Sequence, residues 1–402
     1  MGKPSESSSV EPSEPAVELT SEPAVELTSG PAAELPSGPA AELGAAWPVE
    51  QTSEPAVEQA SEPLAEESSG RPVAMFAMTP ENVARIFPTD VLARLRELVD
   101  IDPSWAAGDF TEPRTRARLA ETEILITGWG CPVLDAETLD AAPKLRAVLH
   151  AAGSVKGFAT PTVWERGIVV SSAAAANALP VAEYTLAMIL LAGKDVFALR
   201  DRLRAERAFP HGGIIPGIGN FGRRVGVVGA SLIGRRLIEL LRPFDLAVSL
   251  ADPYVDEAGA AALDVPLLPL DDLLTGSDVV TVHAPQTPET RHLIGRRELA
   301  LMPAGSVLVN TARGSLVDHD ALVEALRAGH VSAILDVTDP EPLPADSPLY
   351  DLPNAFVTPH LAGSQGNEVA RLGLTVVREA ERLLSGRAPE FPVDPGTLGR
   401  TA

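Results

Sequence analysis

A glycine-rich segment in the second half of the chain could bind a phosphate-bearing ligand. The sequence VGVVGASLIGRRLIELL places Gly229, Ser231 and Gly234 in the frame G-x-G-x-x-G, after a β-branched strand and at the start of a helix. In a dinucleotide-binding turn the first glycine permits the bend, the second position lets the main chain approach the pyrophosphate, and the third lets the helix pack on the strand. Ser231 departs from the pattern, but it is small and its hydroxyl could donate to a phosphate. Free N–H groups at Leu232 and Ile233 would also favour an anion.

An acidic residue follows where a dinucleotide site needs one. Asp252 ends the next expected strand, 23 residues after Gly229. A carboxylate there accepts hydrogen bonds from the adenosine ribose and repels a 2'-phosphate. The sequence therefore predicts NAD rather than NADP as the cofactor. A plain strand-turn-helix unit without a ligand is the alternative.

Three later motifs carry a cation, an acid and a histidine. They are VLVNTARGSLVDHDAL with Arg313, LDVTDPEPLPADSPLYDLPN with Glu341, and VTPHLAG with His360. Each of the three residues lies just past an expected strand, and ligands bind at the carboxyl edge of open α/β sheets. We therefore expect the three side chains to converge on one cleft.

These motifs, in this order and spacing, resemble the D-isomer-specific 2-hydroxyacid dehydrogenase family over residues 72–390. The resemblance implies an α/β fold with a doubly wound Rossmann-type NAD domain and a smaller flavodoxin-like substrate domain. It implies hydride transfer between NAD(H) and a small 2-oxo or 2-hydroxy acid, with D specificity. By the same resemblance, Arg313, Glu341 and His360 are the catalytic residues.

The three residue types suit the reduction of a 2-oxo acid. His360 is suited to proton transfer because an imidazole titrates near neutral pH. Glu341 would favour the imidazolium and fix the ring orientation, and Arg313 could bind the substrate carboxylate and polarise its carbonyl group. Each residue alone also fits a structural role, as an ion pair, a solvated acid or a hydrogen-bonded histidine. Their joint occurrence favours the catalytic interpretation.

The resemblance implies further contacts to the cofactor. Asp336, at the end of its strand, would contact the nicotinamide carboxamide, with a cap of the strand end as the alternative. His283 and Pro285, in VTVHAPQTPETRHLI, would lie on the adenine side, and Thr311 would also contact the cofactor. His283 could equally be an ordinary strand-end histidine. The remaining histidines lack a metal-ligand spacing, so we expect no metal.

The substrate loop departs from the family pattern. Relatives usually carry a glycine loop with an acid and an asparagine, whereas this chain has HAAGSVKGF. The backbone N–H groups of Ala152, Gly153 and Ser154 could still bind a carboxylate. Lys156 could add charge, although a solvated lysine is the simpler interpretation. Trp129 could form a wall of the pocket or pack in the core.

Short apolar runs that alternate with amphipathic stretches past Arg71 predict an α/β architecture with parallel sheets. In the first part we expect strands at Val73–Met78, Ile124–Thr127 and Ala147–His150, a helix at Thr89–Val99, and a long helix from Pro180, in its first turn, to about Leu199. In the second part we expect strands at Val225–Gly229, Ala247–Ala251, Val279–His283, Val307–Asn310, Ala333–Val337 and Ala355–Thr358, with helices at Ile233–Leu241 and Ala321–Arg327. A last helix, with an apolar face from Val369 to Leu383, should pack on the first domain.

We expect three regions along the chain. Residues 1–70 repeat units such as SEPAVELT, rich in Pro and Glu and poor in large apolar side chains, which predicts a disordered acidic tail. A docking or spacing role is the alternative for that tail. Residues 71–180 and 362–392 should form the substrate domain, and residues 181–361 the NAD domain. The two crossings between them would make a hinge.

The composition of the chain limits the binding partners and the cellular location that we expect. The net charge of -23 argues against nucleic acid or an anionic membrane surface. Cys131 is the only cysteine, which excludes an intramolecular disulfide and fits a reducing cytoplasm. No apolar secretory stretch opens the sequence, and the longest apolar run, Leu186–Gly193, is too short to span a bilayer. We expect a cytoplasmic protein, and the resemblance implies a homodimer.

Two alternative functions use related scaffolds. Formate or phosphite dehydrogenases would keep the fold and the cofactor but change the hydride donor. Corepressors similar to the C-terminal-binding proteins use NAD as a regulatory ligand, and an acidic tail or a surface groove recruits their partners. No peptide-docking motif in this sequence favours the second alternative, and a fold alone does not decide function.

Overall fold

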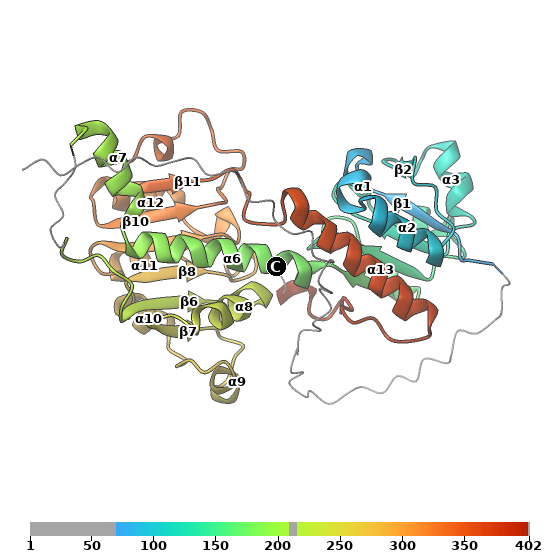
Figure 1. The fold of residues 1–402 in the computed structure, drawn as a ribbon. Helices are drawn as coiled ribbons and strands as arrows, with labels where there is room; N and C mark the ends of the chain where they lie inside the picture. Colours follow the sequence, from blue (N-terminus) through green and yellow to red (C-terminus); the bar gives the residue numbers. More distant parts are fainter. Residues whose placement is uncertain (1–69, 209–214, 401–402) are drawn as a thin grey trace, which may run out of the picture. The chain divides into compact units, whose positions relative to one another are not determined.

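The computed structural model describes residues 70–208 and 215–400 (Figure 1). Apart from Gly70, the predicted acidic tail lies outside the described residues. Within them the strands form one sheet of five strands and one of six, and neighbouring strands run parallel in both sheets. The predicted α/β class is therefore confirmed.

The five-stranded sheet is built mainly from the first part of the chain. Its strands are β1 (Ala74–Ala77), β2 (Ala106–Ala107), β3 (Ile124–Thr127), β4 (Ala147–His150) and β5 (Val169–Ser172). Its helices are α1 (Pro80–Ile86), α2 (Thr89–Leu98), α3 (Pro113–Leu119), α4 (Ala136–Asp140), α5 (Pro161–Glu165) and α13 (Ala370–Leu384). The spatial order β2-β1-β3-β4-β5 is that of flavodoxin-like sheets.

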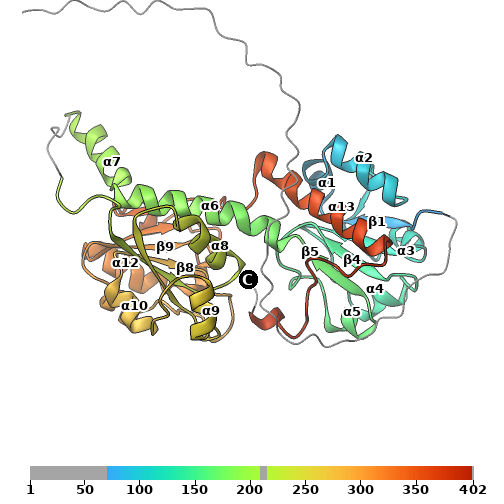
Figure 2. The same ribbon diagram turned by 60° about the horizontal axis from the view of Figure 1, so that its bottom comes forward.

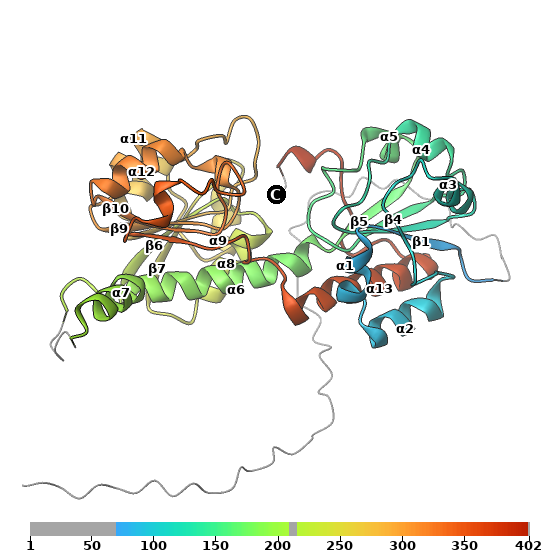
Figure 3. The ribbon, with the colours of Figure 1, turned by 90° about the horizontal axis from the view of Figure 1, so that it is seen from above.

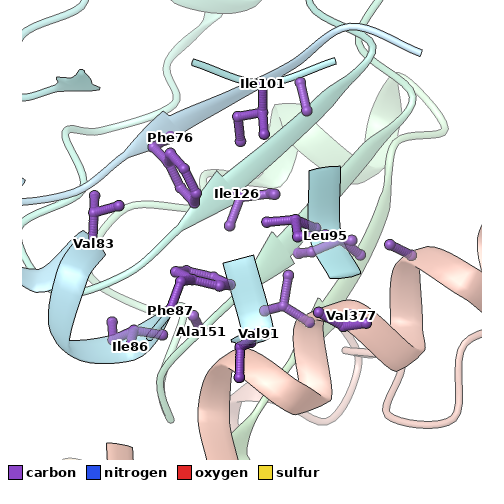
Figure 4. Packing of buried hydrophobic residues seen from close by; sticks show 14 of the residues in the cluster. Phe76, Val83, Ile86, Phe87, Val91, Leu95, Ile101, Ile126, Ala151 and Val377 are labelled. Carbon is purple, nitrogen blue, oxygen red and sulfur yellow. The ribbon is translucent and has the colours of Figure 1, made fainter. Parts of the chain in front are cut away.

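Apolar side chains alternate between the two faces of this sheet, as strand geometry requires. Phe76 and Ile126 pack on one face with Leu95 of α2 and Val377 of α13 (Figure 4). On the other face, Leu125 packs among side chains from α3, α4 and α5. Since α13 supplies buried residues to the first core, its predicted return to this part of the fold is confirmed.

The six-stranded sheet follows along the chain. Its strands are β6 (Arg223–Val228), β7 (Leu246–Ala251), β8 (Val279–Val282), β9 (Ser306–Asn310), β10 (Val331–Leu335) and β11 (Ala355–Val357). The α-helices around it are α6 (Ala174–Gly193), α7 (Val196–Glu206), α8 (Leu232–Leu241), α9 (Glu257–Ala262), α10 (Leu270–Gly276), α11 (Arg296–Leu301) and α12 (His319–Arg327). Helices α6 and α8 lie side by side on one face, and α10, α11 and α12 cover the other (Figures 2 and 3).

The strand order β11-β10-β9-β8-β6-β7 places a topological switch point beside β6. The chain leaves β6 for β7 on one side and later returns to β8 on the other. Ligands bind outside the carboxyl ends of the strands at such a point. Gly229 and His283 directly follow β6 and β8, so the switch point coincides with the glycine-rich turn.

The long helix differs from its prediction at both ends. Helix α6 begins at Ala174, so Pro180 lies inside it rather than in its first turn. The alanine-rich residues before Pro180 have the highest helix propensity, which extends the helix despite the proline. The helix ends at Gly193, and Asp195 takes a left-handed backbone (φ 51°) before α7 begins.

Helix α6 is also long and apolar. Among the described residues it alone has the length and composition to cross a membrane. Its longest uninterrupted apolar run, Leu186–Gly193, is shorter than a membrane span. Ala182 and Ile189 of this helix are completely buried against the six-stranded sheet. Interior helices meet the same criterion, so the finding is only a weak indication of a membrane segment.

Candidate active site

The two glycines of the dinucleotide frame occupy positions where a side chain would not fit. Gly229 has a φ of 99°, and a Cβ atom there would lie 2.7 Å from the backbone nitrogen of Ala284. A Cβ atom on Gly234 would lie 2.1 Å from the carbonyl oxygen of Gly229. The first glycine is thus needed for the bend and the third for the close approach of α8 to β6.

Ser231, at the second position of the frame, caps α8. Its Oγ accepts a hydrogen bond from the N–H of Gly234 at 3.3 Å. An N-cap serine of this kind satisfies one of the free donors at a helix start. The hydroxyl proton of Ser231 is not used in that bond, so donation to a phosphate stays a prediction. Leu232 and Ile233 form the first turn of the helix, and Leu232 is exposed.

Asp252 and Arg235 bind the two main-chain polar groups of Ala230 in the turn. The carboxylate of Asp252 accepts the N–H of Ala230 at 2.7 Å and that of Tyr254 at 2.7 Å. Arg235 donates from Nε to the carbonyl oxygen of Ala230 at 2.9 Å. A carboxylate has about four lone pairs, so Asp252 keeps capacity for ribose hydroxyls. Arg235, which directly follows the third glycine, is not among the residues that the sequence pattern predicts for the site.

The residues predicted on the adenine side differ in exposure. His283 is completely buried, and its Nε2 lies 2.9 Å from Oγ1 of Thr281. Burial lowers the pKa of His283 to about 3, so the ring is neutral. Pro285 is partly exposed, and its carbonyl oxygen accepts a hydrogen bond from Thr290. A side-chain contact between His283 and a cofactor would require the surrounding core to open.

Arg313 follows β9 on a loop with a fixed backbone. Asn310, the last residue of β9, accepts the N–H of Ala312 at 3.0 Å and donates to the carbonyl oxygen of Arg313 at 2.8 Å. Burial lowers the pKa of Arg313, and the negative charge of Glu341 opposes that shift. The guanidinium nonetheless stays charged, as arginine does in proteins.

Two neighbours of Arg313 fix its loop against other elements. The hydroxyl of Thr311 lies 2.9 Å from that of Thr185 in α6. A Cβ atom on Gly314 would lie 2.0 Å from the carbonyl oxygen of Thr338, so the loops after β9 and β10 are in direct contact. Thr311 is buried, and its contact with a cofactor stays a prediction.

His360 and Glu341 form the closest polar contact between the predicted catalytic residues. Nδ1 of His360 lies 2.5 Å from Oε1 of Glu341, and the two side chains are 50% and 43% exposed. His360 has a left-handed backbone with φ 51°, which is uncommon for a residue other than glycine. Nε2 of the ring is therefore free of Glu341 and can face a substrate.

Asp336 fixes the segment that carries His360. Its carboxylate accepts hydrogen bonds from the hydroxyl of Thr358 at 2.7 Å and from the N–H groups of Leu361 and Ala362, each at 2.9 Å. Its carbonyl oxygen accepts the N–H of His360 at 2.9 Å. Asp336 is 1% exposed. These contacts fit the alternative interpretation, a cap at a strand end, and the nicotinamide contact stays a prediction.

The predicted substrate residues follow β3 and β4 in the five-stranded sheet. Ala152 is buried, Gly153 is partly buried and Ser154 is exposed. Trp129 is 41% exposed, so it is no core residue. In the described part of the chain no hydrogen bond or ion pair joins these four residues to Arg313, Glu341 or His360.

A buried histidine, His150, lies next to the predicted substrate loop and contacts residues on either side of it. Nδ1 of His150, the last residue of β4, lies 2.8 Å from Oγ1 of Thr127, and its ring is tilted against Phe158 with 4.8 Å between centroids. Burial lowers the pKa of His150 to about 4, partly offset by a hydrogen bond to the backbone of Ser154. His150 is not among the site residues that the sequence predicts.

The turn fits a dinucleotide on its own geometry. Two positions exclude a Cβ atom, a capped helix start presents N–H groups, and Asp252 offers free lone pairs beside them. Together with the residues after β9, β10 and β11, they lie along one edge of one parallel sheet.

Comparison with known proteins agrees with this geometry. Residues 186–362 match the family model described as "D-isomer specific 2-hydroxyacid dehydrogenase, NAD binding domain". The D-3-phosphoglycerate dehydrogenase of Mycobacterium bovis is 37% identical over 300 residues, which cover 74% of this chain and 55% of that protein. The chain thus spans about half the length of such relatives.

Two further comparisons cover nearly the whole of the matching protein. The glyoxylate reductase of Korarchaeum cryptofilum is 32% identical over 317 residues, or 77% of this chain and 93% of the relative. The crystal structure of a phosphoglycerate oxidoreductase from Rhizobium etli matches with a TM-score of 0.71 and 25% identity, and the match covers 82% of this chain and all of that one. With a family model, relatives and a fold in agreement, the chain belongs to the D-isomer specific 2-hydroxyacid dehydrogenase family.

Proposed function

We propose that the protein is an NAD-dependent oxidoreductase that interconverts a small 2-oxo acid and its D-2-hydroxy acid. The observation that carries the proposal is the 2.5 Å contact between His360 and Glu341, at the sheet edge that also bears Arg313. An imidazole held by a carboxylate is suited to move a proton in either direction. The D configuration rests on the family.

The chain's own residues supply everything except the hydride. Gly229, Ser231 and Gly234 would hold the pyrophosphate, and Asp252 the adenosine ribose. NAD(H), when bound, supplies or accepts a hydride at the carbon that bears the oxygen. Other contacts to it are proposed for Leu232, Ile233, His283, Pro285, Thr311 and Asp336.

Arg313 and His360 would act on the substrate itself. The guanidinium of Arg313 binds the carboxylate and polarises the carbonyl group. His360 donates a proton from Nε2 to the carbonyl oxygen as the hydroxyl group forms, and takes it back in the reverse reaction. Glu341 keeps Nδ1 oriented and stabilises the imidazolium.

The five-stranded sheet would bind the substrate through the loops after β3 and β4, at the substrate's carboxylate or at a second polar group. We assign residues 71–180 and 362–392 to a substrate domain and residues 181–361 to the NAD domain. The backbone N–H groups of Ala152, Gly153 and Ser154 would bind the anion, and Trp129 would form part of the wall. Closure at the two crossings between the domains would exclude water.

We further propose a cytoplasmic homodimer. Helix α7 buries none of its residues, and it exposes Val196 and Leu203. Helix α6 is apolar, yet only 33% of an 18-residue apolar stretch within it is buried. Exposed apolar surface of this kind is typical of protein interfaces. Sedimentation of the purified protein at several concentrations would give the mass in solution.

A spectrophotometric screen would test the reaction. The full chain and NADH would be mixed with pyruvate, hydroxypyruvate, glyoxylate, 3-phosphohydroxypyruvate or branched 2-oxo acids, and the loss of NADH followed. Glyoxylate and 3-phosphohydroxypyruvate are included because relatives are named for these substrate types. Oxidation of NADH that depends on a 2-oxo acid, with a D product on a chiral column, is expected. Activity with formate or phosphite instead would reject the proposal.

A further inference from the structure

Tyr184, a residue without a role so far, contacts the segment that carries His360. It lies in α6, is half-buried, and its hydroxyl oxygen is 2.8 Å from Oγ1 of Thr358. Thr358 directly follows β11 and comes two residues before His360. The contact therefore joins residues 174 positions apart in the sequence.

The direction of this hydrogen bond follows from counting donors. The hydroxyl of Thr358 donates its single proton to Oδ1 of Asp336 at 2.7 Å. Thr358 can then only accept in its contact with Tyr184, because a hydroxyl group has one proton and two lone pairs. Burial raises the pKa of Tyr184, and so does the negative charge of Asp336, so the phenol stays protonated and donates. The bonds run in one direction, from Tyr184 through Thr358 to Asp336.

Asp336 links this chain of hydrogen bonds to the backbone of the segment that carries His360. Its two carboxylate oxygens accept the N–H groups of Leu361 and Ala362, and its carbonyl oxygen accepts that of His360. No ion pair of Asp336 occurs among the described residues. Its buried charge therefore depends on hydrogen bonds, and each lost donor would weaken its hold on the segment.

The segment needs such a hold because His360 is in a left-handed conformation. For residues other than glycine this conformation costs about 1 kcal/mol or more and persists where surrounding contacts impose it. A small rotation there would move the imidazole relative to Glu341 and to a substrate.

We propose that Tyr184 is a positioning residue that acts through Thr358 and Asp336 to hold the backbone of His360 in its reactive geometry. The inference rests on the proposed function, in which His360 moves the proton. Tyr184 itself would touch neither substrate nor cofactor. Its effect should therefore appear in kcat rather than in KM for NADH.

A double-mutant cycle on the full chain tests this chain of bonds. The variants are Tyr184→Phe, Thr358→Val and their combination, with Thr358→Ser as the variant that keeps the hydroxyl. Thr375→Val is the control, because Thr375 of α13 is buried and its hydroxyl donates to a main-chain carbonyl, that of Arg371. Melting temperature and kcat and KM for both substrates are measured for each.

The expected pattern is non-additive. Tyr184→Phe should lower kcat about three- to tenfold and Thr358→Val about ten- to a hundredfold, the ranges for loss of a neutral bond and of a bond to a charged group. The combination should lie within about twofold of Thr358→Val alone, since both changes break one chain of bonds. Thr358→Ser and the control should stay within about threefold of wild type. Additive losses would overturn the proposal.

Hydrogen exchange separates this proposal from the proposed function. Amide exchange at Leu361 and Ala362, followed by mass spectrometry on the protein alone, needs no turnover. Faster exchange there in Tyr184→Phe is expected, with no change in the control. Unchanged exchange would overturn the positioning role even in an active enzyme. If the wild type reduces no 2-oxo acid, the function fails and the exchange result alone decides on Tyr184.

Discussion

Nδ1 of His360 lies 2.5 Å from Oε1 of Glu341, although about half of each side chain is exposed to solvent. Exposed ion pairs contribute about 0 to 1 kcal/mol to folding, because water competes with them and side-chain entropy is lost. Stability therefore gives little reason for this contact. Under the proposed function the contact would orient the ring, since it leaves Nε2 free of Glu341.

Replacing His360 should remove activity without unfolding the protein. Asparagine is the suitable substitute because it tolerates a left-handed backbone better than alanine does. We expect His360→Asn to lower kcat by about two to four orders of magnitude, as for loss of a positioned acid or base. His292→Asn is a matched control, since His292 is also exposed and left-handed (φ 55°). Turnover near that of wild type in His360→Asn would end the assignment.

Removing the charge of Glu341 should have a smaller effect. Glu341→Gln keeps the size of the side chain and an oxygen that can accept from Nδ1 of His360, but it removes the negative charge, and hydrogen bonds to charged groups contribute about 1.5 to 3 kcal/mol. If the bond matters mainly in the transition state, kcat falls about ten- to a hundredfold. The melting temperature should stay close to that of wild type. An equal loss in Glu324→Gln, an exposed carboxylate away from the site, would show that the effect is general.

Asp252 should determine the choice between NADH and NADPH. Asp252→Ser removes the negative charge that would repel a 2'-phosphate, while the positive charge of Arg235 remains at the carbonyl oxygen of Ala230. We expect kcat/KM with NADH to fall about ten- to a hundredfold and the preference to move toward NADPH. Adding Arg235→Ala should remove the gain with NADPH. The neutral variant Asp252→Asn, which keeps an acceptor for Ala230, separates charge from turn geometry.

The neutral His150 should make the protein less stable in mild acid. Burial lowers its pKa to about 4, whereas in an unfolded chain it is roughly 6.5. Between these values the unfolded chain binds a proton that the folded protein does not. The free energy of unfolding should therefore fall as the pH drops from 6.5 to 4, by about 1.4 kcal/mol per pH unit from this residue, and level off below.

Urea unfolding at several pH values measures this slope. His150→Asn, which keeps a polar atom near Thr127, should reduce the slope by that amount over the same range. Equal slopes in wild type and His150→Asn would mean that His150 is protonated in the folded protein.

The sequence predicted most strands because they are continuous apolar runs. Strands β3 and β4 occupy the predicted residues, since every side chain in them is buried. The boundary of α6 could not be predicted in the same way. Local rules place a proline at a helix start, but the alanine-rich residues before Pro180 continue the helix, and its buried face compensates for the lost bond.

The site was predictable in its residue types but not in its connections. Motif order placed Arg313, Glu341 and His360 after neighbouring strands, and the direct contact of the last two agrees with that. The bond from Tyr184 to Thr358 joins distant positions, and nothing in the local pattern around a tyrosine in a helix indicates it. Such contacts depend on packing between elements, which a single sequence does not reveal.

The missing side chain of Gly314 also bears on how this edge of the sheet can move. Because a single methyl group there would overlap the carbonyl group of Thr338, the loop of Arg313 rests on the loop that begins at Asp336. Asp336 in turn accepts hydrogen bonds from the backbone of the segment that carries His360. The three segments should consequently shift as one rigid body, so that under the proposed function Arg313 and His360 would keep their mutual spacing as substrates enter and leave.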